Sequence, residues 1–390
     1  MDRAGKRKIL IVAGDPSGDL HAAKLAAELK KLDGAVSITA MGGVRLREVS
    51  DDFLYNLVAV NASGFTAPAT HLALWIKLLF SLKGFMKKEK PAAVVTVDFY
   101  GFNYQVLKIA AKRNIPAYHY ISPQVWASRP GRIKKLIKVA KRIFVLFPFE
   151  EKLYRDAGGE ALFVGHPLMD IVPEPARRAL PAGGKWNIGI LPGSRAGELH
   201  KHLKMFAEAF YLIKKEFPRA RGLLFAVPEF TDADIGRELS PVKENWRDDI
   251  EIVRENDYLK RSTLDYALTC SGTATLENGL LGIPMTVVYR LPRLTYEIAR
   301  RIILVKYISL VNIILDRPAV KELIQNDFLA ESAAEDALGY LRAPEKLLAK
   351  RKELLALRNM LGEKHESGVL AARSIIDDIN VEGKTNGRTA

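Results

Sequence analysis

The second half of the chain contains the stretch YALTCSGTATLE at residues 266–277, in which an apolar run is followed at once by small polar residues. This pattern predicts a strand that turns directly into a helix at Ser271, Gly272 and Thr273. Such a turn directs backbone N–H groups and the positive end of the helix dipole at one point, which favours phosphate oxygens. Glu277 lies early in the helix, where its carboxylate can accept hydrogen bonds from a ribose diol. The stretch therefore predicts a nucleotide-diphosphate site.

Short apolar runs alternate with amphipathic segments along the rest of the chain, a pattern that predicts parallel sheets in an α/β protein. Two Rossmann-like domains facing a cleft are expected, and ligands of such sheets bind at the carboxyl ends of the strands. The predicted strands are residues 8–13, 37–41, 93–98, 117–121 and 143–147 in the first half, and 187–191, 222–227, 266–269 and 285–288 in the second.

Composition predicts the domain boundaries. A proline- and glycine-rich stretch at 172–184 predicts a linker between an N-terminal domain at 1–171 and a C-terminal domain at 185–340. Residues 341–380 are rich in Leu, Lys, Glu and Ala, which predicts terminal helices that cross back to the first domain or pack on a neighbouring subunit. The last residues, 381–390, are expected to be frayed.

The length of 390 residues, 48% hydrophobic and 27% charged, predicts two globular domains. The single cysteine, Cys270, excludes an internal disulfide framework. Neither export nor a membrane-spanning helix is expected, because the apolar runs are too short for a signal peptide or a span. The net charge of +14 predicts an acidic partner, which is nucleic acid, an anionic membrane surface or a phosphorylated substrate.

Two predicted strand ends in the first half carry candidate site residues. In the loop at 13–21 the backbone near Ser17 and Gly18 can approach a ligand, although an ordinary strand–helix turn with a cap explains the same residues. Asp98 stands at the carboxyl end of the apolar strand predicted at 93–98. A carboxylate there is partly desolvated, which raises its pKa toward that of a useful general base, but position alone equally allows a helix cap.

The segment YHYISPQVWA at 118–127 combines flat aromatic rings with hydrogen-bonding groups, as a sugar site requires. Rings packed into a core would explain the tyrosines of this strand. Core packing does not explain Ser122, Gln124 and Trp126 together. The segment is therefore a second candidate for ligand contact in the first domain.

The second domain is predicted to begin with LPGSR at 191–195, directly after a strand. Gly193 permits close approach of the backbone, Ser194 can donate to a phosphate, and Arg195 offers a planar fork that matches one. A Pro-Gly turn by itself is weak evidence. Paired with the strand–helix turn at 271–277, it predicts a pyrophosphate clamp.

A nearly continuous apolar segment with a lysine cluster occupies residues 67–88. It fits an interfacial helix in an anionic membrane surface, and it also fits a buried core helix whose lysines reach water. The basic charge of the chain favours the membrane. The candidate membrane contacts, in a segment set at about 65–88, are Leu72, Leu74, Trp75, Leu78, Leu79 and Phe80.

Taken together, these segments resemble the bacterial lipid-A-disaccharide synthase family, which are inverting glycosyltransferases of the GT-B fold. The set of motifs carries the resemblance, which runs from about residue 9 to residue 325. The chain departs from the family pattern at Asp15, where Glu is usual, and at Gly101, where a second aspartate is common. The matching segments are 13–20, 41–43, 98, 102–103, 122–127, 148–150, 165–167, 191–195, 271–277, 284–285, 309–312 and 321–325.

The resemblance implies one reaction: UDP-2,3-diacylglucosamine donates its sugar to 2,3-diacylglucosamine 1-phosphate (lipid X), giving a β-1,6-linked disaccharide phosphate and UDP. It implies a cytoplasmic protein, peripheral on the inner face of the inner membrane among anionic lipids. Asp98 is the expected general base. No cofactor is expected, and no acidic pair with metal-ligand spacing flanks the site, which predicts a metal-independent enzyme.

The binding roles follow the same resemblance. Arg195, Ser194 and the backbone at 271–273 are expected to hold the pyrophosphate, and Glu277 the ribose. The resemblance alone assigns the remaining positions, with Ser17 and Gln124 at the cleft and Asn312 and Gln325 near the donor.

Two rival interpretations stay open at this point. One is another GT-B enzyme, a transferase or epimerase acting on unacylated UDP-N-acetylglucosamine, which would share the clamp but lack the 122–126 block. The other is a basic binding module without catalysis. A nucleic-acid partner is not expected, because the basic residues are spread along many helices and no RNA-binding signature is present. The sequence leaves open whether the chain forms a homodimer.

Overall fold

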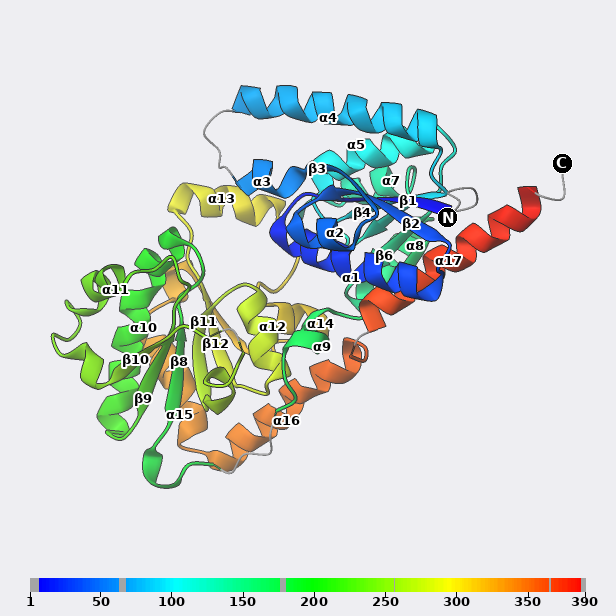
Figure 1. Ribbon diagram of the computed structural model, residues 1–390. Coiled ribbons are helices and arrows are strands. Elements are labelled where there is room, and N and C mark those ends of the chain that lie inside the picture. The colour runs from blue at the N-terminus through cyan, green and yellow to red at the C-terminus, as the bar shows by residue number, and fades with distance from the viewer. Residues whose placement is uncertain (1–6, 63–67, 176–179, 256, 365, 387–390) are drawn as a thin grey trace. The chain divides into compact units, whose positions relative to one another are not determined.

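The computed structural model describes residues 7–62, 68–175, 180–255, 257–364 and 366–386, and the chain divides into two compact units (Figure 1). The first unit runs to Pro167 and resumes at Leu361, and the second unit comprises Leu168–Met360. The second unit thus begins just before the expected linker at 172–184, of which residues 176–179 lie outside the described ranges.

In the described residues, the first unit holds a seven-stranded parallel sheet in the order β3-β2-β1-β4-β5-β6-β7. Its strands are β1 (Arg7–Ala13), β2 (Val36–Gly42), β3 (Asp52–Asn56), β4 (Ala93–Val97), β5 (Ala117–Tyr120), β6 (Arg142–Val145) and β7 (Ala161–Phe163). In β1, Ile9 and Ile11 enter one hydrophobic core, while Leu10 and Val12 enter another. Because both faces are covered, the central strands are continuous apolar runs.

Helices cover both faces of this sheet. One of them, at the end of the chain, returns to pack along the helix after β1. In this terminal helix Asp378 accepts a hydrogen bond from the Tyr118 hydroxyl at 3.1 Å and pairs with Arg142 at 3.1 Å. The helices are α1 (Pro16–Leu32), α2 (Val44–Val49), α3 (Leu57–Ala62), α4 (Pro68–Glu89), α5 (Tyr100–Ala111), α6 (Val125–Ser128), α7 (Gly131–Leu136), α8 (Pro148–Asp156) and the terminal α17 (Glu366–Asn386).

The second unit has a parallel sheet of six strands in its described residues, in the order β10-β9-β8-β11-β12-β13. The strands are β8 (Asn187–Leu191), β9 (Arg221–Phe225), β10 (Ile250–Val253), β11 (Tyr266–Cys270), β12 (Met285–Tyr289) and β13 (Lys321–Ile324). The helices are α9 (Leu168–Ile171), α10 (Ala196–Glu216), α11 (Asp232–Leu239), α12 (Thr273–Leu280), α13 (Arg293–Ile302), α14 (Leu310–Leu315), α15 (Ala330–Leu341) and α16 (Pro344–Met360). Short 3₁₀ helices are η1 (Ala182–Gly184), η2 (Trp246–Asp248), η3 (Arg261–Thr263) and η4 (Gln325–Asp327).

The predicted fold class, two Rossmann-like parallel sheets with helices at the C-terminus, is confirmed. All nine predicted strands are present, and the described residues add four more, β3, β7, β10 and β13. These four are the two edges of each sheet. The strand order reverses between β1 and β4 in one sheet and between β8 and β11 in the other. A crevice for ligands opens outside the carboxyl ends of the strands at such switch points.

Candidate functional site

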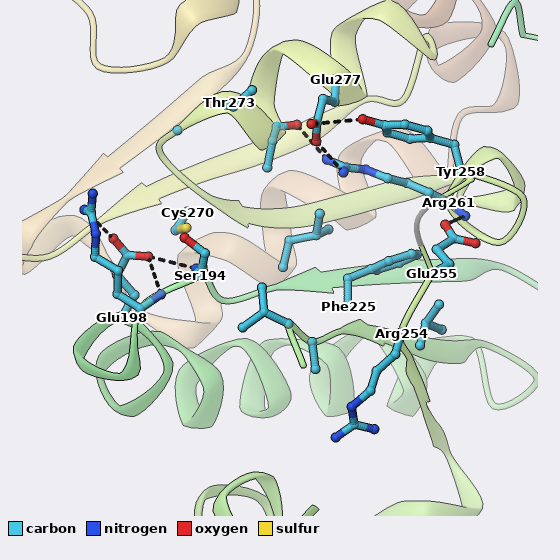
Figure 2. Close-up of a pocket in the computed structure, with 18 of the residues that line it drawn as sticks. Ser194, Glu198, Phe225, Arg254, Glu255, Tyr258, Arg261, Cys270, Thr273 and Glu277 are labelled. Atoms are coloured by element: carbon cyan, nitrogen blue, oxygen red, sulfur yellow. Dashed lines mark hydrogen bonds and ion pairs between the residues drawn. The ribbon is translucent and has the colours of Figure 1, made fainter. Parts of the chain in front are cut away.

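A cavity of about 590 Å³ lies in the second unit, at its switch point (Figure 2). Its walls come from the segments that follow β8, β9, β10 and β11. Ser194, Arg195, Ser271, Gly272, Thr273 and Glu277, all predicted to bind the donor, line it. The segments at 191–195 and 271–277, far apart in the sequence, therefore meet because β8 and β11 are neighbours.

The loop between β8 and α10 is held by the helix that it precedes. Gly193 has φ +116°, in the region that favours glycine. The Glu198 carboxylate accepts hydrogen bonds from the backbone N–H groups of Ser194 at 3.0 Å and Arg195 at 3.2 Å, and it pairs with the Arg195 guanidinium at 3.2 Å. Buried His202, on the same helix, lies 3.1 Å from the Pro192 carbonyl through Nδ1, so this nitrogen is the donor.

The loop between β11 and α12 brings a second helix N-terminus to the cavity. Gly272, with φ +155°, precedes α12, and a Cβ there would meet open space. Thr273 and Ala274, the first residues of the helix, line the cavity. The Ser271 hydroxyl donates to the Ile308 carbonyl at 2.7 Å, so it positions the loop. The positive ends of α10 and α12 thus both lie at the cavity wall, an arrangement that favours anions.

Glu277 is oriented by two residues that the sequence analysis missed. Tyr258 donates its hydroxyl to Glu277 at 3.0 Å, and Arg261 pairs with the same carboxylate at 2.5 Å (Figure 2). The Arg261 guanidinium also donates to the Asn278 side chain at 2.8 Å and to the Ala274 carbonyl at 2.9 Å. Burial, followed by the Glu277 charge, raises the pKa of Tyr258, so the phenol stays protonated and donates.

Tyr258 has a left-handed backbone with φ +63°, which is rare outside glycine. Such strain often accompanies functional sites. Both Tyr258 and Arg261 follow β10, an edge strand whose end residues are buried while the two between them are exposed and half-buried. Recognising that strand would have marked the polar segment after it as a strand end, and hence as a candidate for the site.

The carboxyl end of β4 in the first unit carries Asp98. Both Asp98 and Phe99 have left-handed backbones, with φ +47° and +44°. Asn103 holds this turn by donating its amide to the carbonyls of Val97 at 3.0 Å and Asp98 at 2.8 Å. Burial and then the nearby Asp15 charge raise the pKa of Asp98 to about 6. Its carboxylate accepts from the N–H of Phe99 at 2.8 Å, and the residue at the N-cap of α5 is Phe99, so Asp98 is not that cap.

The loop after β1 lies beside this turn, because β1 and β4 are neighbours. A Cβ at Gly14 would be 2.1 Å from the Phe99 ring, so only glycine fits there. Asp15 caps α1 by accepting from Gly18 N–H at 2.7 Å, while Ser17 is exposed. The Gly18 backbone is therefore engaged in the cap, and the exposed Ser17 hydroxyl is the better placed for ligand contact.

The 118–127 segment is largely occupied by internal packing. Trp126 donates its indole N–H to Glu150 at 2.9 Å, and the Ser122 and Tyr154 hydroxyls lie 2.7 Å apart. Burial raises the pKa of Glu150 to about 7. Gln124 is exposed at the start of α6. Internal partners thus account for Ser122 and Trp126, while Gln124 faces solvent.

Asn312 and Gln325 are not among the described residues that line the cavity. Asn312 is buried, and its amide donates to the Val320 carbonyl and to Glu322, each at 2.8 Å. Gln325 clamps the backbone of Leu291, accepting from its N–H at 2.6 Å and donating to its carbonyl at 3.2 Å. Both residues therefore fix loops of the second unit.

The helix α4 divides the predicted membrane contacts between two faces. Leu72 is 58% exposed and Phe80 is 64% exposed, whereas Leu78 is buried in the core. Leu74, Trp75 and Leu79 are partly buried and pack against the same core. The residues at 65–67 lie outside the described ranges. None of the helices in the described ranges combines the length and apolar character needed to cross a bilayer.

No cluster of three or more His, Cys, Asp or Glu side chains in the described ranges is placed to hold a metal ion. The cavity itself offers two helix N-termini, the Arg195 guanidinium and the oriented Glu277 carboxylate.

Comparisons with known proteins agree with this geometry. The chain is 34% identical to the lipid-A-disaccharide synthase of Geobacter metallireducens, with 93% of this chain and 95% of that protein covered. It is 32% identical to that of Neisseria meningitidis, with 95% and 97% covered. Among solved structures, a putative UDP-N-acetylglucosamine 2-epimerase from Listeria monocytogenes superposes with a TM-score of 0.61, covering 97% of each chain. At 13% identity, this likeness shows a shared fold only.

A family model described as lipid-A-disaccharide synthetase matches residues 9–375, which include both sheets apart from the first two residues of β1, and about the first half of α17. Together with relatives above 30% identity along nearly the whole chain, this match separates the chain from the epimerases, which share only its fold. The chain belongs to the lipid-A-disaccharide synthetase family.

Proposed function

We propose that this chain makes the lipid A disaccharide by transferring 2,3-diacylglucosamine from UDP-2,3-diacylglucosamine to 2,3-diacylglucosamine 1-phosphate, with release of UDP. Family membership supports the reaction. The observation that carries it is the cavity of the second unit, where the N-termini of α10 and α12 adjoin a carboxylate fixed by Tyr258 and Arg261. These are the groups that a nucleoside diphosphate requires: donors for phosphate and an acceptor for ribose.

In this proposal the second unit binds the donor. The diphosphate lies against the loop at 193–195 and the start of α12, and Arg195 approaches it with a charged planar fork. Glu277 accepts hydrogen bonds from the ribose hydroxyls. As the sugar–phosphate bond breaks, negative charge grows on UDP, and the helix N-termini stabilise it without any movement of charge in the protein.

The first unit supplies the base. The acceptor hydroxyl oxygen attacks the anomeric carbon on the face opposite UDP, its proton passes to Asp98, and the electrons of the broken bond remain on UDP. An Asp98 pKa of about 6 suits this role, because the carboxylate is mostly ionised at neutral pH yet more basic than an ordinary aspartate. General-base catalysis of this kind contributes roughly 10²–10⁴-fold.

The exposed face of α4 is proposed to contact the inner face of the inner membrane, where both lipid substrates lie. Leu72, Ile76 and Phe80 follow one another at helical spacing, and all three are exposed. Lys83 lies 5.9 Å from the centre of the Phe80 ring and can reach anionic headgroups. The opposite face of the helix, with Leu78, Leu82 and Met86, belongs to the core.

The reaction is tested by incubating the purified protein with UDP-2,3-diacylglucosamine and labelled 2,3-diacylglucosamine 1-phosphate, without added metal. Disaccharide phosphate and UDP in equal amounts are the expected products. Release of UDP from UDP-N-acetylglucosamine, with no disaccharide from the acylated pair, would contradict the proposal.

A further inference from the structure

The Glu198 carboxylate occupies the groups that the donor diphosphate would need. In Figure 2 its side chain points at the loop after β8, with dashed contacts to that loop. It accepts from the backbone N–H groups of Ser194 and Arg195 at 3.0 and 3.2 Å, and it pairs with the Arg195 guanidinium at 3.2 Å. Two amides and a guanidinium are thus held by one internal anion.

The space above Gly193 is also filled by this side chain. A Cβ at Gly193 would lie 2.3 Å from the Glu198 carboxylate and 2.7 Å from its Cβ. The space left by the missing side chain of Gly193, through which a phosphate could approach the backbone, therefore holds the Glu198 side chain. Glu198 itself lines the cavity, and its side chain is 22% exposed.

The Glu198 charge also acts on the end of β11, directly before the loop that leads into α12. Burial and then the Glu198 charge raise the pKa of the Cys270 thiol to about 12. Cys270 ends β11, directly before the Ser271–Thr273 turn. A diphosphate bound between the loops at 193–195 and 271–273 would place its negative charge near the Glu198 carboxylate. Two negative charges that lie close together repel each other.

We propose that Glu198 is a built-in counter-anion of the donor site. It keeps the 193–195 loop in its binding conformation and is displaced by the donor diphosphate. The proposal rests on the proposed function, because it assumes a diphosphate ligand at this cavity. Arg195, whose side chain is 82% exposed, exchanges its carboxylate partner for phosphate oxygens. Glu198 acts through the loop and is a positioning residue.

A simpler role for the same contacts is a capping box, in which the third helical residue accepts from the backbone at the start of α10. The two roles make different predictions for Glu198→Gln. Gln keeps a side-chain oxygen that can accept from the loop, so a cap alone would leave ligand binding unchanged. Displacement of an anion depends on its charge, which Gln lacks.

The test compares Glu198→Gln with the native protein by titration with UDP, inorganic pyrophosphate and uridine, monitored by calorimetry. We expect UDP and pyrophosphate to bind about 10-fold more tightly to the variant, since a repelling charge at a partly exposed site has been removed. Uridine affinity should stay the same, because uridine brings no phosphate.

The matched control is Glu208→Gln, which removes the same charge from α10 at a 40% exposed side chain that faces Lys204. It should alter none of the three affinities, and melting temperatures of all proteins verify folding. Equal or weaker UDP binding by Glu198→Gln, in a variant that melts like the native protein, would overturn the proposal. Failure of UDP and pyrophosphate to bind any of these proteins would instead overturn the donor site itself.

Discussion

Replacing Asp98 by Asn is expected to remove most of the turnover while making the protein more stable at every pH above about 4. Asn keeps the side-chain oxygen that accepts from the N–H of Phe99 at 2.8 Å. It also tolerates the left-handed backbone at this position, φ +47°, better than most residues do. The substitution therefore removes the charge and the basic group while the geometry of the turn is retained.

The size of the effect follows from the pKa. Burial and the Asp15 charge raise the pKa of Asp98 from 3.8 to about 6. Because the folded state holds this proton more tightly than the unfolded state, its contribution to stability is full below pH 3.8 and is lost as the pH rises through 6. Asn does not titrate, so the variant should gain roughly 1–2 kcal/mol over the native protein at pH 5 and up to about 3 kcal/mol at pH 8.

The assay combines urea unfolding at pH 5 and pH 8 with turnover at saturating substrate and a titration with UDP. Turnover of Asp98→Asn should fall roughly 10²–10⁴-fold, because a general base is lost. UDP affinity should stay within about twofold, since the donor groups assigned here lie in the second unit. The control is Asp156→Asn, an acid in the same unit whose side chain is 63% exposed and paired with Lys152. It should change none of the three quantities: stability, turnover or UDP affinity.

Loss of turnover together with loss of stability at pH 8 would refute the reasoning, because it would mean that the ionised carboxylate stabilises the fold. Retention of turnover with the expected gain in stability would refute only the role of Asp98 as the base. The native pH profile gives an independent check: kcat/KM should fall on the acid side with a pKa of about 6.

The remaining predictions concern the donor carboxylate, the exposed face of α4 and metal dependence. Glu277→Gln should raise the donor KM about 10-fold with a small change in kcat, measured by initial rates, because the ribose loses a charged acceptor; a fall in kcat alone would argue against ribose binding. The double variant Leu72→Ser with Phe80→Ser should weaken binding to anionic vesicles at least about tenfold in sedimentation, since full burial of each side chain contributes about 1.5–3 kcal/mol. Leu348→Ser, at a leucine that is 47% exposed in the second unit, is the control and should bind vesicles as the native protein does. Chelator treatment should leave the rate unchanged, and restoration of a lost rate by a divalent cation would contradict the metal-free mechanism.

Central and edge strands differ in how far the sequence predicts them. The central strand β4 is buried throughout, so it is an unbroken apolar run that sequence inspection finds. The strands missed by the sequence analysis are edges such as β3, with an exposed first residue and otherwise half-buried residues, and β10, which mixes buried and exposed residues. Edge strands are covered on fewer sides, and natural proteins keep them short and polar, so hydrophobic pattern alone does not reveal them.

The strand-end loops of the candidate site are local features that the residue pattern predicts, because a strand followed at once by Pro-Gly-Ser-Arg or Ser-Gly-Thr is typical of a turn into a helix. Which side chains then meet at those loops was decided by the tertiary structure. Arg261 reaches Glu277 because the segments after β10 and β11 line one cavity. Burial raises the pKa of Asp98, and the Asp15 charge adds to that rise because β1 and β4 are neighbours. Likewise, Leu72 and Leu78 lie in the same apolar helix, and only the packing of that helix decides that Leu72 is exposed while Leu78 is buried. Partners set by strand order lie far apart along the chain, and a local pattern carries no record of them.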